Sequence, residues 1–325
     1  MDRTLWWDSL TTRLYVRYND GSSTQWVQAA ASTVDLDLTS VVAKTGDTMT
    51  GALVLYGPPT ADLQAATKKY VDDSGAAAAT IENYLSGYNT ANDTTDATND
   101  IVIDRGICAD STNARMIRVV TQMIKQLDVA WAPGNNAGGR MSLAGIADTT
   151  YHLHAIVNPS SGAADFGFDV SPTAPTLPTG FTHFRRIASI KREAGAIRLY
   201  YQDGDLFQWR SMATDRNSAS AVAWSLLALT LPLGIRVQPI VNQYLVTSAV
   251  TTDISVEVGD ARDTTRANPQ YLIWSKFGSE ANYGSVTGGF YSNTSGQISF
   301  RVVVTAGAPG NCVTQTRGYI DTRGK

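Results

Sequence analysis

The chain has 325 residues, which is long enough for two or three domains and a substantial hydrophobic core. Charged residues make up only 17% of the chain, below the roughly 25% of ordinary soluble domains, and the net charge of −3 argues against a nucleic-acid-binding role. The longest apolar stretch, residues 221–231, is too short for a transmembrane helix, and no signal-peptide pattern follows Met1.

Residues 1–30 predict a small β unit. Residues 14–18 and 22–27 have strand composition, and Asn19-Asp20-Gly21 between them is a turn signal. The aromatic residues of this unit have two interpretations: they form most of its core, or they face a binding partner. The second interpretation makes this unit an attachment end whose contact residues are Trp6, Trp7, Tyr15 and Trp26.

Residues 44–84 predict a turn, a short strand and a helix. Glycines and an aspartate favour a tight turn at residues 46–51. Residues 52–56 read as a strand, which Gly57-Pro58-Pro59 would end. Thr60 is a good N-cap for a helix of strong helix formers that begins near residue 63.

The stretch at residues 44–71, KTGDTMTGALVLYGPPTADLQAATKKYV, resembles a module of the tail fibres and related virion fibres of tailed bacteriophages. Residues 5–27 are similar to segments near the start of such proteins, and residues 125–250 resemble distal parts of tail fibres. The resemblance implies a virus particle as the setting, a structural or adhesive role, and a parallel homotrimer.

The predicted helix carries residues at alternating spacings of four and three, which is typical of a helix-association seam. The seam residues are Leu63, Thr67, Tyr70, Ser74, Ala77, Ile81 and Tyr84. Because several of them are small, and because Gly75 inside the helix costs about 1 kcal/mol relative to alanine, the helix would need flanking β domains. With the homotrimer that the resemblance implies, this helix would be a short trimeric stalk; the alternative is a single amphipathic helix that lies on its own domain.

The rest of the chain predicts β structure. Residues 89–100 are rich in turn formers and predict a linker or an exposed loop. From about residue 101 onward, alternating runs such as residues 253–258 and 298–302 are separated by Gly, Pro and Asn turns, which predicts one or two antiparallel β-sandwiches. Residues 114–127 fit a helix as well as a strand.

Two histidines are the best candidates for a metal site. His152 and His154 share one face of a predicted strand, and in a trimer three such pairs could surround a metal ion. We favour hydrogen-bonded histidines in the core, and the sequence leaves open whether the pair binds metal.

Other polar clusters have structural interpretations. Asp93, Asp96 and Asp100 lack the spacing of a calcium loop and are expected to be solvated. The basic cluster at residues 185–192 fits edge-strand charge, with contact to an anionic host glycan as the alternative. Cys108 and Cys312 are expected to be buried free thiols.

These observations predict a mainly β protein: an N-terminal β attachment unit (residues 1–43), a fibre module with a trimeric helix (44–91) and a C-terminal antiparallel β-sandwich region (92–325), assembled as an elongated homotrimer. We expect a phage tail-fibre protein of the virion, assembled in the host cytoplasm, which needs no cofactor, contacts other virion proteins at its N-terminal end and binds the host surface distally. The alternatives are a capsid-decorating head fibre or a neck fibre without receptor binding, and a glycan depolymerase. Because no catalytic motif or β-helix repeat occurs, an enzyme is the less favoured alternative.

Overall fold

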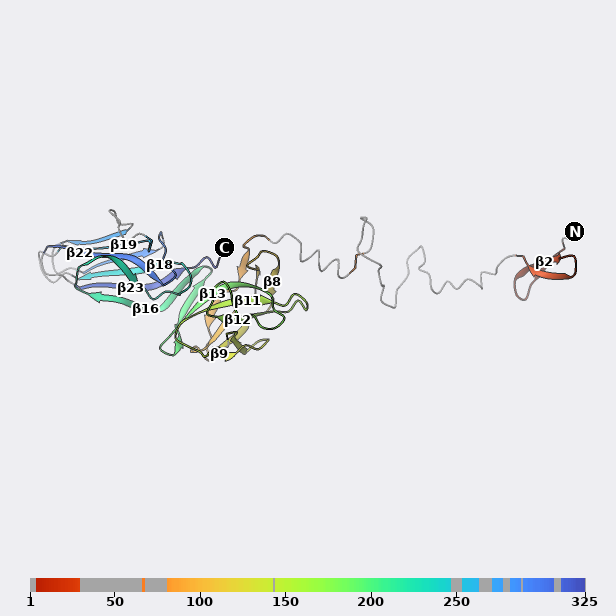
Figure 1. Cartoon of the computed structure of the whole chain (residues 1–325), viewed down its shortest axis with the longest axis horizontal. Coiled ribbons are helices and arrows are strands. Elements are labelled where there is room, and N and C mark those ends of the chain that lie inside the picture. Colours follow the sequence, from red (N-terminus) through yellow and green to blue (C-terminus); the bar gives the residue numbers. More distant parts are fainter. Residues whose placement is uncertain are drawn as a thin grey trace. The chain divides into compact units, whose positions relative to one another are not determined.

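The computed structural model describes residues 4–29, 66–67, 81–142, 144–246, 253–262, 271–276, 281–287, 289–306 and 311–324. The chain divides into two compact units, Met1–Thr67 and Lys68–Lys325. Strands account for all of the regular secondary structure among these residues (Figure 1).

The smaller unit contains a three-stranded antiparallel sheet in the order β1-β2-β3, made of β1 (Leu5–Asp8), β2 (Arg13–Asn19) and β3 (Thr24–Gln28). The predicted strand, turn and strand are therefore confirmed. The β2–β3 turn is held by Asp20, whose Oδ1 accepts hydrogen bonds from the backbone N–H groups of Ser22 and Ser23. These bonds lower the pKa of the exposed Asp20 to about 2, because they stabilise the charged carboxylate.

The larger unit contains an eight-stranded sheet in the order β14-β13-β11-β12-β10-β9-β6-β5. Its strands are β5 (Thr90–Asn92), β6 (Asp100–Ile103), β9 (Met123–Ala130), β10 (Ala137–Arg140), β11 (Thr150–Val157), β12 (Ala164–Asp169), β13 (His183–Glu193) and β14 (Ala196–Ile197). All neighbours are antiparallel except β10, which is parallel to both β9 and β12.

This sheet curls into a nearly closed barrel because its two ends approach each other. Ile197 at one edge donates its N–H to the carbonyl of Thr98, which lies in the loop between β5 and β6. Just beyond β14, the N–H of Tyr200 donates to Oδ1 of Asn92 on the other edge strand. We call this sheet the barrel sheet. Its curvature leaves little exposed strand edge, which is the usual protection against edge-to-edge aggregation.

A second sheet, in the order β4-β7-β8, packs against the barrel sheet and consists of β4 (Leu85–Gly87), β7 (Gly106–Ala109) and β8 (Met116–Val119). Tyr88 connects the two sheets. Its ring lies edge-on to Phe166 of β12 at a centroid distance of 5.3 Å, and its hydroxyl donates to the carbonyl of Ile117 on β8. Because the hydroxyl is buried, the phenol is protected from ionisation and its pKa is raised.

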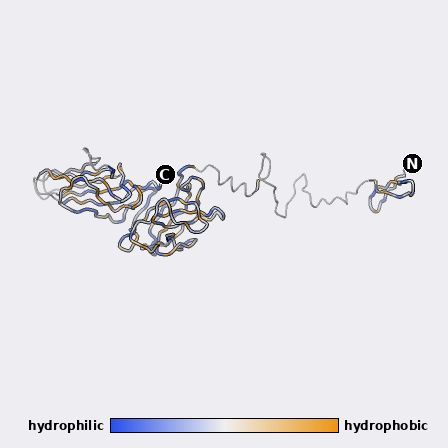
Figure 2. The backbone as a smooth tube through the Cα atoms, viewed as in Figure 1, coloured by the Kyte–Doolittle hydropathy of each residue, from blue (hydrophilic) through white to orange (hydrophobic). Residues whose placement is uncertain are grey.

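The C-terminal part contains a five-stranded sheet in the order β15-β16-β23-β18-β21 and a four-stranded sheet in the order β17-β22-β19-β20, both antiparallel (Figure 1). The strands of the first are β15 (Tyr200–Asp203), β16 (Leu206–Ser218), β18 (Gln238–Val246), β21 (Ala281–Thr287) and β23 (Asn311–Ile320). Those of the second are β17 (Val222–Ala228), β19 (Asp253–Gly259), β20 (Tyr271–Lys276) and β22 (Gln297–Ala306). Hydrophobic and hydrophilic residues alternate along many of these strands, which gives each sheet one buried face (Figure 2).

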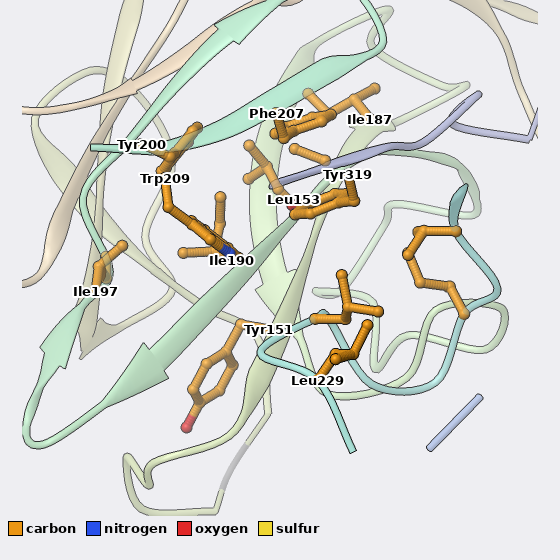
Figure 3. Close-up of a cluster of buried hydrophobic side chains, with 14 of the residues drawn as sticks. Tyr151, Leu153, Ile187, Ile190, Ile197, Tyr200, Phe207, Trp209, Leu229 and Tyr319 are labelled. Carbon is orange, nitrogen blue, oxygen red and sulfur yellow. The ribbon is translucent and has the colours of Figure 1, made fainter. Parts of the chain in front are cut away.

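The barrel sheet and the five-stranded sheet share one aromatic core (Figure 3). Phe207 of β16 stacks on Tyr319 of β23, with ring centroids 5.0 Å apart and planes 5° from parallel. The hydroxyl of Tyr319 donates to the carbonyl of Ser189 on β13. Trp209 packs beside Tyr319 and donates its indole N–H to the carbonyl of Thr230. The hydroxyl of Tyr319 and the indole N–H of Trp209 thus each have an acceptor, as buried polar atoms of aromatic side chains usually do.

The fold-class prediction was wrong because it included a helical stalk. No helix occurs among the described residues. Within the predicted helix, Thr67 and Ile81 have no regular structure and Tyr84 directly precedes β4, while Leu63, Tyr70 and Ala77 lie outside the described residues. Helix propensity alone rarely holds a helix unless an apolar face is buried. Ile81, a predicted seam residue, is 69% exposed.

Two further expectations were corrected. Residues 89–100, predicted to be a linker or an exposed loop, are part of the barrel sheet: they form β5 and the start of β6, and a loop does join the two strands. Asp93 and Asp96 stabilise this loop by accepting backbone hydrogen bonds. The first part of the predicted sandwich region forms a nearly closed barrel. The ambiguous residues 114–127 form β8 and the start of β9.

Gly138 is required where β10 approaches β9. A Cβ atom at this position would lie 1.9 Å from the carbonyl oxygen of Ala130, an approach that no side-chain adjustment relieves. We expect Gly138→Ala to lower the free energy of unfolding by about 1–3 kcal/mol or more, as measured by urea denaturation. Gly145→Ala is the matched control, since a Cβ there meets open space, and it should change stability by less than about 1 kcal/mol. Equal stabilities of the two variants would contradict the close approach.

Candidate functional site

The N-terminal sheet exposes aromatic side chains on both of its faces. Trp6 and Tyr15 are cross-strand neighbours with ring centroids 5.4 Å apart, and Trp26 lies 6.0 Å from Trp6. Because successive side chains alternate between faces, Trp7 lies on the opposite face, directly across from Leu14. The structure therefore brings three of the four predicted attachment residues together and separates the fourth.

These rings do not form an enclosed core. Trp6, Trp7 and Trp26 remain 48%, 57% and 45% exposed, and none of the described residues of this unit is a buried hydrophobic residue. Leu5 is also 62% exposed, on the same face as Trp7. Burying a further 100 Å² or so of each tryptophan would contribute about 2.5 kcal/mol per side chain. The sequence left two interpretations, a core or a contact surface. A single sheet with both faces exposed favours the second, contact with a partner.

The two candidate metal-binding histidines lie in the core of the barrel sheet. His152 Nδ1 is 2.9 Å from Oγ of Ser189, and His154 Nε2 is 3.0 Å from the carbonyl oxygen of Ser171. Both side chains are buried, which lowers the pKa of His152 to about 3 and that of His154 to about 4, since burial disfavours the charged imidazolium. Among the described residues, no group of three or more His, Cys, Asp or Glu side chains could hold a metal ion.

The other residues considered from the sequence are the aspartates near residue 93 and the two cysteines. Asp93 and Asp100 are buried, not solvated as expected. For Asp100, burial and the neighbouring carboxylates raise the pKa to about 6. Cys108 and Cys312 are buried free thiols, as predicted.

Sequence reasoning missed a pocket of about 620 Å³ in the larger unit. Its lining includes four arginines from three separate stretches of the chain: Arg185, Arg186, Arg236 and Arg323. Only the first pair is visible as a cluster in the sequence, where it was expected to be edge-strand charge. In the structure this pair lies on β13, whose neighbour along this part is β11, and Arg185 is buried. Arg236 and Arg323 carry no local signal, because only the fold brings them to β13.

No helix among the described residues is long and apolar enough to cross a membrane. Comparison of the whole chain with protein-family models and with curated proteins finds no match.

Proposed function

We propose that the chain is a fibre protein of a tailed-phage particle, attached to the virion through its N-terminal sheet and binding the host cell surface through its larger unit. The observation that carries the attachment half is the exposure of tryptophan on both faces of the N-terminal sheet. The virion setting is supported by the phage-fibre resemblance of residues 44–71, all but two of which lie outside the described residues.

The binding half of the proposal is supported by the architecture of the larger unit. A scaffold made of strands holds loop residues in fixed positions, as recognition surfaces require. The association of three copies, which the resemblance implies, would multiply weak contacts into strong avidity. Light scattering of the purified chain tests the trimeric state, since three copies of a 34.9 kDa chain have a mass of about 105 kDa.

We expect Trp7→Ser to reduce the number of copies incorporated per particle by about 30-fold. This corresponds to a loss of ~2 kcal/mol, which is typical for truncating a large aromatic side chain at the centre of an interface. The measurement is quantitative immunoblotting of purified particles. Tyr201→Ser is the matched control, because Tyr201 is 59% exposed but belongs to the larger unit. Equal incorporation of the Trp7→Ser variant and the wild type would contradict attachment through this sheet.

Antibody labelling of intact particles tests the location. Labelling at the tail tip or baseplate by an antibody against the larger unit would support host recognition. Labelling on the capsid or neck would instead favour a decorating or neck fibre, and the proposed adhesive role would then be rejected.

A further inference from the structure

The arginine-lined pocket lies where several distant segments of the larger unit meet. β13 contributes Arg185 and Arg186, the loop before β18 contributes residues 234–236, and the segment after β23 contributes residues 321–324. A pocket of about 620 Å³ has the size of a small-molecule site. Because separate stretches of one unit form the pocket, the packing of these stretches sets its shape.

Most of the pocket's positive charge is paired. Arg186 makes a two-pronged contact with Asp321, with Nη1 to Oδ2 at 2.5 Å and Nη2 to Oδ1 at 2.9 Å. Arg323 Nε donates to Asp205 at 3.0 Å, and Arg236 Nη2 lies 3.5 Å from Oδ2 of Asp260. These three ion pairs leave one arginine of the lining without a carboxylate partner among the described residues.

That arginine is Arg185, which is 5% exposed. Within the part of the chain that the structure describes, its guanidinium donates only to backbone carbonyls: Nε to Arg323, and Nη2 to Asn83 and Gly324. Nη1 donates no hydrogen bond to the described residues, and it is not one of the fully enclosed atoms that lack a partner. Burial lowers the pKa of Arg185, and the charge of the nearby Asp110 opposes this shift. The hydrogen bonds of the Asp110 carboxylate, however, come from its own loop.

A nearly buried guanidinium that none of the described carboxylates contacts is costly, since moving an ion out of water is repaid only by good partners. An anion in the pocket would supply that partner. Arg236 is also positioned for such contact, because its side chain is 41% exposed and its guanidinium lies over the ring of Tyr291 at 5.2 Å. Arginine is well suited to this role, since its planar fork matches a carboxylate.

The remaining lining favours a sugar as the carrier of the anion. Hydroxyl and amide side chains are contributed by Asn83, Ser111, Thr173, Thr294 and Thr322. Pro172, Phe184 and Ile235 add apolar surface. A saccharide presents both hydroxyls and apolar ring faces, so this combination with arginine matches an acidic sugar better than an inorganic ion, which has no apolar face.

We propose that this pocket binds an acidic sugar residue of a cell-surface glycan, with the sugar's carboxylate contacting Arg185 and Arg236. This inference deepens the proposed host-binding function and rests on it for the source of the glycan. The sugar ring would lie against the apolar part of the lining, and the threonine hydroxyls would bond its hydroxyl groups.

Calorimetric titration of the full chain with glucuronic acid tests the proposal, with glucose and glucose 6-phosphate as comparison ligands. We expect glucuronic acid to bind with a Kd of about 1 mM and glucose to bind at least tenfold more weakly. Equal binding of glucuronic acid and glucose, or no binding of glucuronic acid, would overturn the proposal. Tighter binding of glucose 6-phosphate than of glucuronic acid would overturn the carboxylate assignment in favour of a phosphorylated sugar.

We expect Arg236→Gln to weaken glucuronic acid binding about tenfold. The matched control is Arg210→Gln, since Arg210 also lies over a tyrosine ring, that of Tyr201 at 5.1 Å, but outside the pocket lining. Arg236→Lys keeps the charge without the planar fork and should give an intermediate Kd, which keeps the test decisive if the glutamine variant does not fold. Unchanged binding in a folded Arg236→Gln variant would reject the site.

Whole-cell binding separates this inference from the proposed function. A chain that binds host cells but not acidic sugars keeps the fibre function and rejects the pocket's role. Conversely, a chain that binds glucuronic acid through Arg236 but is found on the capsid or neck keeps the pocket and rejects the host-recognition function.

Discussion

Lys125→Met is expected to lower the free energy of unfolding by about 3–5 kcal/mol, the range for removing one partner of a buried ion pair. Lys125 lies on β9 with its side chain fully buried. Its Nζ is 3.2 Å from Oδ1 of Asp165 on β12, and it donates to the carbonyls of Ala132 and Gly134 at 2.7 and 3.2 Å. The substitution removes the cation and leaves the Asp165 carboxylate buried without it.

The effect is large because one ammonium group organises the β9–β10 connection. Lys125 binds the loop's carbonyls, while Oδ2 of Asp165 accepts the N–H of Gly134 at 2.7 Å. The indole of Trp131 lies 5.5 Å from Nζ and adds a cation–π contact. Burial lowers the pKa of Lys125, and Asp165 opposes this shift by favouring the charged form.

Urea denaturation at pH 7 measures this loss, and Lys191→Met is the matched control. Lys191 is also a lysine of the barrel sheet, but it is only partly buried and lies 4.0 Å from Glu193. Its loss should cost less than about 1 kcal/mol. The double variant Lys125→Met/Asp165→Leu should recover part of the lost stability, because no unpaired charge remains. A Lys125→Met variant as stable as the Lys191→Met control would contradict the ion pair's role.

Acid is expected to destabilise the larger unit through its two buried histidines. Between about pH 6.5 and pH 4, His152 and His154 are neutral in the folded chain and protonated in the unfolded chain. The unfolded state therefore binds more protons, so stability falls as pH falls. Each histidine contributes a slope of about 1.4 kcal/mol per pH unit.

The charged groups around the pair set this direction. Burial is the largest cause of both lowered pKa values, and Arg186 adds repulsion to each imidazolium. Asp169 opposes the shift of His154. Elsewhere in the barrel sheet, the raised pKa of Asp100, about 6, acts in the opposite direction between about pH 4 and 6, because a protonated folded carboxyl gains stability as pH falls.

Comparison of variants isolates the histidines from Asp100. We expect His152→Gln and His154→Gln each to flatten the stability profile by about 1.4 kcal/mol per pH unit, measured by urea denaturation between pH 4.5 and 7. His183→Gln is the control, since His183 is only partly buried and its ring contacts the neighbouring Thr182. An unchanged slope in both buried-histidine variants would show that acid unfolding arises elsewhere.

Local patterns in the sequence determined the β character of the chain. The Asn19-Asp20-Gly21 turn and the alternating strands were recognisable because both a hairpin turn and a half-buried strand require particular residue types at neighbouring positions in the sequence. The burial of Cys108 and Cys312 was also predictable, because thiols without an oxidising partner behave as small apolar side chains. Five aromatic residues in so short a unit were a visible signal as well, although the sequence could not distinguish a core from a contact surface.

The tertiary structure alone decided closure, burial and the pocket. The aspartates near residue 93 suggested a solvated linker, but long-range pairing of β5 and β6 within the barrel sheet buries Asp93 and Asp100. Arg185 joins Arg236 and Arg323 only because β13, the loop before β18 and the segment after β23 converge. Such contacts can join residues that are more than one hundred positions apart in the sequence, so no local pattern encodes them. The predicted helix shows the converse: its propensity and spacing were local features, but its described residues Thr67, Ile81 and Tyr84 are not helical, because local propensity rarely holds a helix whose apolar face is not buried.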